Sequence, residues 1–156
     1  MNFEVELKLA LKEDDRAEEL SKKNSISHEE MNRYRGRVLL IQAKLDGLAE
    51  DLADEIDRLK LELIKNDAQI QQAMAQVQIS ANLVARNNRL NERKAGTVSD
   101  DEVATAEGQL RISDGQRAIV RAEKAKVELR IQQLQKRVGR IKEVLKKAEP
   151  PRELKP

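Results

Sequence analysis

Apolar residues recur at alternating steps of three and four along much of this chain, and this spacing limits its possible folds more than any other feature. Near the C-terminus the run is unbroken and comprises Val127, Ile131, Leu134, Val138, Ile141, Leu145 and Ala148. Such steps place side chains on one stripe of a helix, and a sustained stripe is typical of a coiled coil. The sequence therefore predicts an all-α chain whose long helices bury a narrow seam.

The composition fits a narrow seam better than a compact core. The 156 residues include one Phe, one Tyr and no Trp, while 37% of them are charged. Large aromatic side chains normally fill a globular core, and a mixture rich in Leu, Ala and charged residues is typical of long helices. A membrane-spanning helix needs a run of about 18 apolar residues, and the chain has none. No membrane span is therefore predicted.

The distribution of charge argues against nucleic acid as a partner. Thirty Lys and Arg residues are interleaved with 28 Asp and Glu residues, which gives a formal net charge of +2. A nucleic-acid-binding surface needs a one-sided basic stripe, and single-stranded ligands also need aromatic stacking platforms. The chain has no cysteine either, which excludes a thiolate nucleophile and a Cys metal site.

Two short stretches interrupt the helical pattern, and both have the signature of a helix end followed by a helix start. Asn24 and Gly96 are residues that readily adopt the left-handed conformation found just after a helix. Each is followed by Ser-x-x-Glu, the capping box in which Ser and Glu satisfy each other's backbone N–H groups. The boxes begin at Ser27 and Ser99. Each stretch is therefore predicted to be a turn between two helices.

The two turns divide the chain into three helices, predicted at about residues 3–23, 28–94 and 100–148. Antiparallel pairing about each turn then predicts an elongated coiled coil of a short, a long and a medium helix, with the turns at opposite ends. We assign residues 1–148 to this single domain. Residues 149–156 form a Pro-rich tail that cannot continue the third helix.

The seam of the long helix is predicted from its apolar residues alone. It comprises Val38, Ile41, Leu45, Leu48, Leu52, Ile56, Leu59 and Leu63, and it resumes at Ile70, Met74, Val77, Ala81 and Val84. Residues 3–11 show a different pattern, because apolar residues at odd positions alternate with mostly charged ones, as in a strand. Their residue types favour helix, and no second strand is present to pair with them. Helix is therefore the preferred interpretation.

No group of residues has the pattern of an active site, a cofactor site or a metal site. His28 is the only histidine, and its acidic neighbours point away from it at successive helical angles. The acid pairs Asp14–Asp15 and Asp100–Asp101 are interpreted as acids near helix starts, where the helix dipole favours negative charge. We predict a protein without catalytic, cofactor-binding or metal-binding residues, which acts by contacting other proteins.

The two turns also repeat one longer motif. It reads Arg-x3-Leu-x6-Ser at the first turn and Arg-x3-Leu-x8-Ser at the second. The residues are Arg16, Leu20 and Ser27 in the first copy and Arg86, Leu90 and Ser99 in the second. The pattern resembles the tip of the α-helical hairpin in periplasmic adaptor proteins, also called membrane fusion or hemolysin-D-like proteins, of bacterial tripartite efflux and secretion systems.

The resemblance implies a function in envelope transport. In that family the motif contacts the periplasmic end of an outer-membrane channel, so the six motif residues become the candidate protein-contact residues. A location in the periplasm or cell envelope is implied as well. The chain departs from the family because it contains no strand-rich sequence for a lipoyl-like or β-barrel domain.

A second class of function stays open. The first residues of the chain are acidic where a secretory signal would be basic, which predicts a cytoplasmic location. The same pattern suits a cytoplasmic coiled-coil scaffold or spacer, which binds partner helices or a second copy of itself along its side. In that case Ser27 and Ser99 are only helix caps, and Leu20 and Leu90 belong to the seam.

Overall fold

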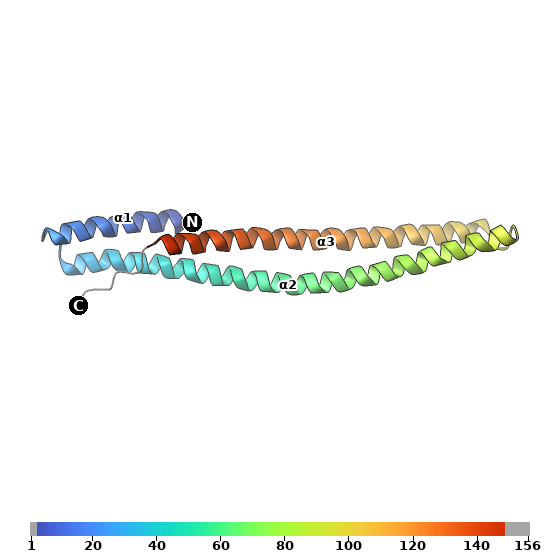
Figure 1. Ribbon diagram of the computed structural model, residues 1–156, viewed down its shortest axis with the longest axis horizontal. Helices are drawn as coiled ribbons and strands as arrows, with labels where there is room; N and C mark the ends of the chain where they lie inside the picture. The colour runs from blue at the N-terminus through green and yellow to red at the C-terminus, as the bar shows by residue number, and fades with distance from the viewer. Residues whose placement is uncertain (1–2, 149–156) are drawn as a thin grey trace. The chain divides into compact units, whose positions relative to one another are not determined.

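Three helices make up the computed structural model, which describes residues 3–148 and the side chains from Val5 onward (Figure 1). Helix α1 spans Phe3–Lys22, α2 spans His28–Arg93 and α3 spans Asp100–Lys147, with 20, 66 and 48 residues. No strand occurs between residues 3 and 148. The predicted all-α fold with three helices is confirmed, and each helix ends one residue before its predicted end. The Pro-rich tail lies outside the described residues.

The contacts divide the chain into two compact units. Unit 1 comprises Met1–Asp57 and Gln132–Pro156, and unit 2 comprises Arg58–Ile131. Helices α2 and α3 therefore contribute to both units, whereas α1 belongs to unit 1 alone. Within the described residues, no helix is apolar enough over 18 residues to cross a membrane. The assignment of residues 1–148 to a single domain stays a prediction.

Unit 1 has a core to which all three helices contribute, and α1 runs beside the first part of α2 (Figure 1). The buried apolar side chains are Leu7, Ala10, Ala17, Met31, Val38, Ile41, Leu45, Ala49, Leu52, Ile56, Leu134, Ile141 and Ala148. Along α1 the buried positions follow steps of three and four. Residues 3–11 are helical, as preferred from the sequence. The buried side chains of α1 follow the helical period, and the alternation of apolar residues does not correspond to a strand.

An ion pair is buried between α1 and α2 in unit 1. The Nε atom of Arg35 lies 3.9 Å from Oδ1 of Asp14, and the Nη2 atom of Arg35 lies 3.8 Å from Oε2 of Glu18. The side chains of Arg35 and Asp14 are 7% and 8% exposed. Asp14 therefore lies in the middle of α1, where it is buried beside Arg35. Its interpretation as an acid near a helix start is wrong.

Unit 2 pairs the second part of α2 with the first part of α3. Lys124 Nζ donates to Asp67 Oδ1 at 2.7 Å, and the hydroxyls of Ser80 and Ser113 lie 3.2 Å apart. The hydrogen bond that Lys124 donates to Asp67 raises the pKa of Lys124 above its usual value. Few side chains are buried in this unit, namely Asn66, Ser80, Ala106, Ser113, Val127 and Ile131. Two helices alone therefore cover their seam only in part.

The seam of α2 in unit 2 differs from the prediction. Met74 was expected in the seam but is 41% exposed, whereas Ser80 is only 2% exposed. Positions with reduced exposure keep a strict spacing of four and three, through Asn66, Ile70, Ala73, Val77, Ser80 and Val84. The prediction was wrong because it passed over polar residues. A buried serine is acceptable at this position because it pairs with Ser113, whose own hydroxyl donates to the Gln109 carbonyl at 2.9 Å.

Candidate functional site

Both turns end the preceding helix with a residue in the left-handed conformation, as predicted. Asn24 has a φ of 54° and Gly96 a φ of 76°. At the first turn, the Ser25 N–H donates to the Leu20 carbonyl at 2.9 Å. This bond belongs to the Schellman motif, which satisfies carbonyl groups that have no partner within the helix. The chain therefore leaves α1 and α2 through defined turns.

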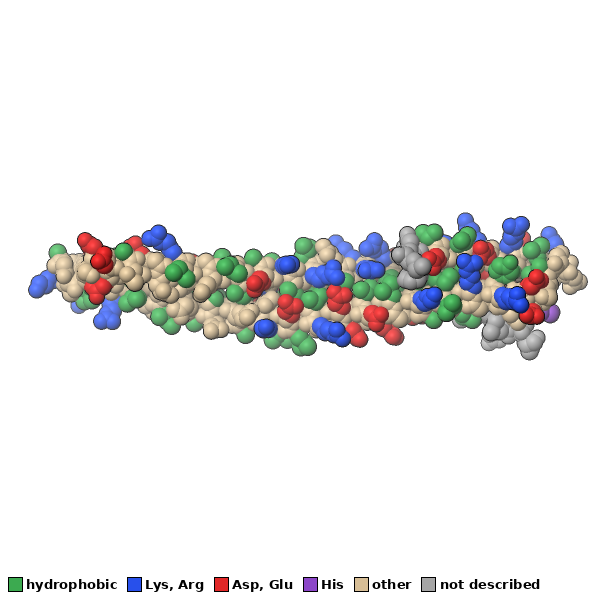
Figure 2. Space-filling view, turned by 180° about the vertical axis from the view of Figure 1, so that it is seen from behind, with side chains coloured by type: hydrophobic (Ala, Val, Ile, Leu, Met, Phe, Trp, Pro, Cys, Tyr) green, Lys and Arg blue, Asp and Glu red, His purple; other side chains and the backbone are tan. Residues whose placement is uncertain are grey.

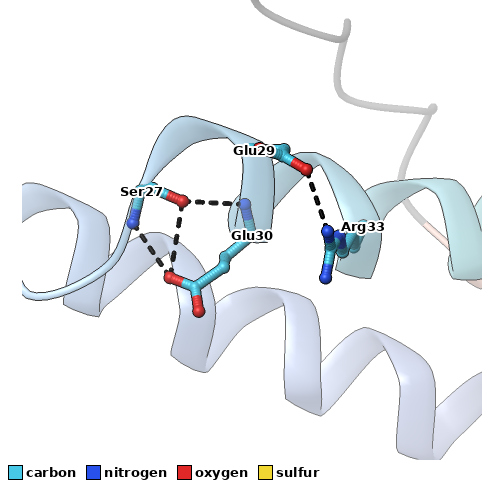
Figure 3. A network of polar contacts seen from close by, with 4 residues as sticks. All are labelled: Ser27, Glu29, Glu30 and Arg33. Carbon is cyan, nitrogen blue, oxygen red and sulfur yellow. Dashed lines mark hydrogen bonds and ion pairs between the residues drawn. The ribbon is translucent and has the colours of Figure 1, made fainter.

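Both turns also start the next helix with the predicted capping box. At the start of α2, Ser27 Oγ accepts from the Glu30 N–H at 3.2 Å, and the Ser27 N–H donates to Glu30 Oε2 at 3.1 Å (Figure 3). At the start of α3, Ser99 Oγ accepts from the Glu102 N–H at 3.3 Å, and the Ser99 N–H donates to Glu102 Oε2 at 2.9 Å. The two capping boxes are confirmed, and both motif serines therefore have a structural role.

Asn91 holds the second turn in place and was not singled out from the sequence. Its Nδ2 atom donates to the Val98 carbonyl at 3.1 Å, and its Oδ1 atom accepts from the Val98 N–H at 2.8 Å. One amide side chain thereby occupies both backbone groups of a residue in the turn. The sequence did offer one indication of this role, because Asn91 lies seven residues after the seam residue Val84 and shortly before Gly96.

The first copy of the contact motif has one exposed charged group. Arg16 is exposed and Leu20 is half-buried, and they lie one helical turn apart on the same side of α1. Ser27 is exposed but lies beyond the turn, where its hydroxyl takes part in the capping box. In this copy the structure leaves Arg16 as the group that a partner can reach.

The second copy of the motif lies at a groove. Arg86 and Leu90 line it from α2, Thr97 and Val98 from the turn, and Glu102 from the start of α3. The groove has a volume of about 590 Å³. It combines apolar surface with a cation and an anion, which is a suitable surface for a protein segment that carries an apolar anchor and polar groups. Ser99 itself is exposed and serves as the cap.

The capping box at the second turn changes the acidity of its glutamate. Hydrogen bonds from the backbone and then from the hydroxyl of Ser99 lower the pKa of Glu102 below its ordinary value of 4.5. A carboxylate whose pKa is lower in the folded state stabilises that state at pH values above the unfolded pKa. This stabilisation is lost as the pH falls through the folded pKa. The cap of α3 therefore weakens in acid.

Replacing Ser99 by alanine should destabilise the chain by about 1 kcal/mol, because an N-cap hydroxyl is lost. Glu102→Gln should destabilise it at neutral pH and have no effect at a pH below the folded pKa of Glu102. Urea denaturation followed by circular dichroism at both pH values measures these changes. Ser25→Ala provides the control, because Ser25 lies in a turn but caps no helix. An equal effect of all three substitutions would contradict the assigned roles.

His28 begins α2 and is exposed, and within residues 3–148 no three His, Asp or Glu side chains are arranged to hold a metal ion. Asp100 and Asp101 lie in the first turn of α3, as interpreted from the sequence. The groups with defined geometry near the turns are therefore caps and groove residues.

A comparison of the chain with models of protein families, with characterised proteins and with solved structures gave no match. The resemblance to periplasmic adaptor proteins rests on the turn motif and stays a prediction.

Proposed function

We propose that this chain is a protein-contact module whose contact end is the second turn, at residues 94–99. The observation that carries the proposal is the groove in which Arg86 and Leu90 lie beside Val98. The turn is held by Asn91 and by the cap of α3, so the groove exists before a partner arrives. A preformed groove loses less conformational entropy on binding than a flexible loop would.

The proposed arrangement of the helices is an elongated antiparallel coiled coil. In unit 2 the two helices pair in an antiparallel way about the second turn. Ser80 pairs with Ser113, and Asp67, which lies further before the turn, pairs with Lys124, which lies further after it. Helix α2 is continuous over 66 residues, a length of roughly 100 Å at ~1.5 Å per residue. Small-angle scattering from a compact particle would contradict this arrangement.

The proposed role is that of the hairpin in a periplasmic adaptor protein, which bridges to an outer-membrane channel or to another coiled coil in envelope transport. The support is the second copy of the motif, in which the Arg and the Leu share one groove. The proposal requires the protein in the cell envelope. Fractionation that places the protein wholly in the cytoplasm would reject it.

Crosslinking from the second turn tests the contact directly. A photo-crosslinking residue in place of the exposed Lys94 should capture a partner protein in cells, and Arg86→Ala or Leu90→Ala should reduce capture about tenfold. Truncating an anchor residue of an interface commonly weakens binding by that amount or more. The yield of the crosslinked product, determined by immunoblotting and mass spectrometry, is the measurement.

The first turn provides the matched control. A crosslinker in place of the exposed Lys23, with Arg16→Ala and Leu20→Ala as the paired variants, tests the other copy of the motif in the same chain. The proposal expects capture from the second turn to exceed capture from the first. Equal capture at both turns, unaffected by any of these substitutions, would count against a contact at the second turn.

The alternative function, a scaffold that binds along its side, also has a specific observation in its favour. Large apolar side chains of unit 2 are exposed on both helices, namely Leu61, Ile64, Met74, Ile79, Leu83, Ile112, Ile119 and Leu129. A chain with this function can be cytoplasmic. It is expected to be insensitive to substitutions at either turn.

A further inference from the structure

The groove at the second turn continues along the helix pair, away from the turn. It shares Gln109 with a second hollow of about 470 Å³, and the second hollow shares Gln69 with a third of about 490 Å³. All of the lining residues belong to unit 2. The three hollows therefore form one groove, here called the flank groove, which extends along α2 from Leu90 to Leu59.

Two rows of side chains form the walls of the flank groove. The row on α2 recurs every seven residues and comprises Glu62, Gln69, Gln76, Leu83 and Leu90. The row on α3 has the same spacing and comprises Glu102, Gln109, Gln116, Glu123 and Arg130. A spacing of seven keeps side chains on one side of a helix in a coiled coil, so each row lies beside the seam. The groove therefore follows one flank of the helix pair.

The middle of the flank groove is uncharged. It is lined by Ala73, Val120 and Ile119, of which Ile119 is 60% exposed, and by five glutamines, namely Gln69, Gln72, Gln76, Gln109 and Gln116. Charged side chains line the groove on either side of this part, namely Arg86, Asp101 and Glu102 near the turn and Glu62, Lys65, Glu123, Lys126 and Arg130 further from it. On the face of unit 2 seen in Figure 2, a stretch of hydrophobic and uncharged side chains likewise lies between charged ones.

The charges and the shape of the flank groove indicate what occupies it. A charged group of a partner against the uncharged middle would lose its water without gaining an ion pair, so the partner is uncharged there. A hollow between two packed helices receives the side chains of one further helix. A second copy of this chain has the same hollow on this face, so helix would meet helix at the rims and leave the hollows empty. The groove therefore favours a helix of another protein.

The length of the flank groove matches the area that specific binding requires. From Leu90 to Leu59 the groove is about 47 Å long at ~1.5 Å per residue, and a helix about 12 Å wide covers roughly 560 Å² of it. The two partners together would bury about 1,100 Å², slightly more than the minimum of about 1,000 Å² for a specific interface. The part at the turn, from Leu90 to Leu83, provides roughly a quarter of this area and is too small by itself.

We infer that the segment bound at the second turn is a single amphipathic helix of another protein, which lies along the whole flank groove and is uncharged over its middle part. This inference rests on the proposed function, because it identifies what occupies the groove at Arg86 and Leu90. It adds that the contact extends along the flank as far as Leu59.

Crosslinking from two positions of the full chain tests whether one helix occupies the groove. In cells, a photo-crosslinking residue in place of the exposed Gln72 should capture the same protein as one in place of Lys94. Mass spectrometry should place the two crosslinked sites on one helix of that protein, about 20 residues apart, because all α-helices have the same rise per residue. Crosslinked sites on separate segments, or no capture from position 72, would overturn the inference.

The exposed Arg121 provides the control position for the crosslinker. It follows the seam residue Val120 and lies on the other flank of the helix pair. Capture from position 121 should be at least about tenfold weaker than capture from position 72. Equal capture from both flanks would show that the groove does not define the contact.

A substitution in the uncharged middle tests the same contact without a crosslinker there. Ile119→Glu should reduce capture from position 94 about tenfold, because it introduces a charge that the bound helix would bury. Met74→Glu is the matched control, since it introduces the same charge at an exposed residue of the other flank, and it should leave capture unchanged. Both positions are exposed and glutamate is a good helix former, so circular dichroism should be unchanged in both variants.

Failure of this inference and failure of the proposed function give different results. Capture from position 94 that depends on Arg86 and Leu90 but not on Ile119 overturns the inference and leaves a contact at the turn alone. Absence of any capture from position 94 overturns both. Capture of a second copy of this chain overturns the assignment of the helix to another protein.

Discussion

Replacing Arg35 by methionine should lower the free energy of unfolding by about 3–5 kcal/mol, because it leaves the buried carboxylate of Asp14 without the cation that faces it. The two side chains are 7% and 8% exposed, so water cannot replace the lost partner. Urea denaturation measures the change. Tyr34 is the only tyrosine of a chain without tryptophan, and its fluorescence reports on unit 1.

Arg33 provides a control on the same helix. Figure 3 shows its ion pair with Glu29. The Nη2 atom of Arg33 lies 2.9 Å from Oε1 of Glu29, but both side chains are more than 70% exposed. Arg33→Met should therefore change the stability by less than about 1 kcal/mol. The double variant Asp14→Leu with Arg35→Met should recover most of the loss, since an apolar pair replaces the buried ions. Equal effects of the two single arginine variants would show that Arg35 is not buried in solution.

Replacing Leu45 by alanine should lower the free energy of unfolding by about 2–5 kcal/mol. Leu45 is 1% exposed and lies in the core of unit 1, where truncation removes apolar contacts and leaves a cavity. Leu40→Ala is the matched control, because Leu40 lies on the same helix and is 57% exposed. The same urea denaturation, followed through Tyr34, compares the two variants. A small effect at Leu45 would mean that the helices of unit 1 do not pack closely in solution.

The helices could be predicted from the sequence because their ends are encoded locally. Asn24, Gly96 and the two Ser-x-x-Glu boxes each act on backbone groups within a few residues, so their effect is visible without tertiary information. The all-α class followed from the apolar spacing and the scarcity of aromatic residues. The helical state of residues 3–11 was also correct, although the alternation of apolar residues suggested a strand.

The polar parts of the interior could not be predicted. Asn66, Ser80 and Ser113 occupy seam positions, and Arg35 and Asp14 are buried together, although residues of these types usually lie at the surface. Their burial depends on partners supplied by another helix, which a single sequence does not reveal. For the same reason Met74 was placed in the seam.

The candidate contact residues stay a prediction, and their geometry could not be foreseen from the sequence. The motif identified Arg86, Leu90 and Ser99, but it did not indicate that the first two line a groove while the third is engaged as a cap. The bonds of Asn91 to the turn were not predicted either, because they depend on how the chain bends after Gly96.

The contacts within unit 2 also predict the order in which it folds. Asn91 and Val98 are 7 residues apart, Ser80 and Ser113 are 33 apart, and Asp67 and Lys124 are 57 apart. The entropy lost in closing a loop grows with its length, so we expect the hairpin to form first at the turn and then to extend along both helices. Substitutions at Asn91 are consequently expected to slow folding, whereas substitutions at Asp67 are expected mainly to accelerate unfolding.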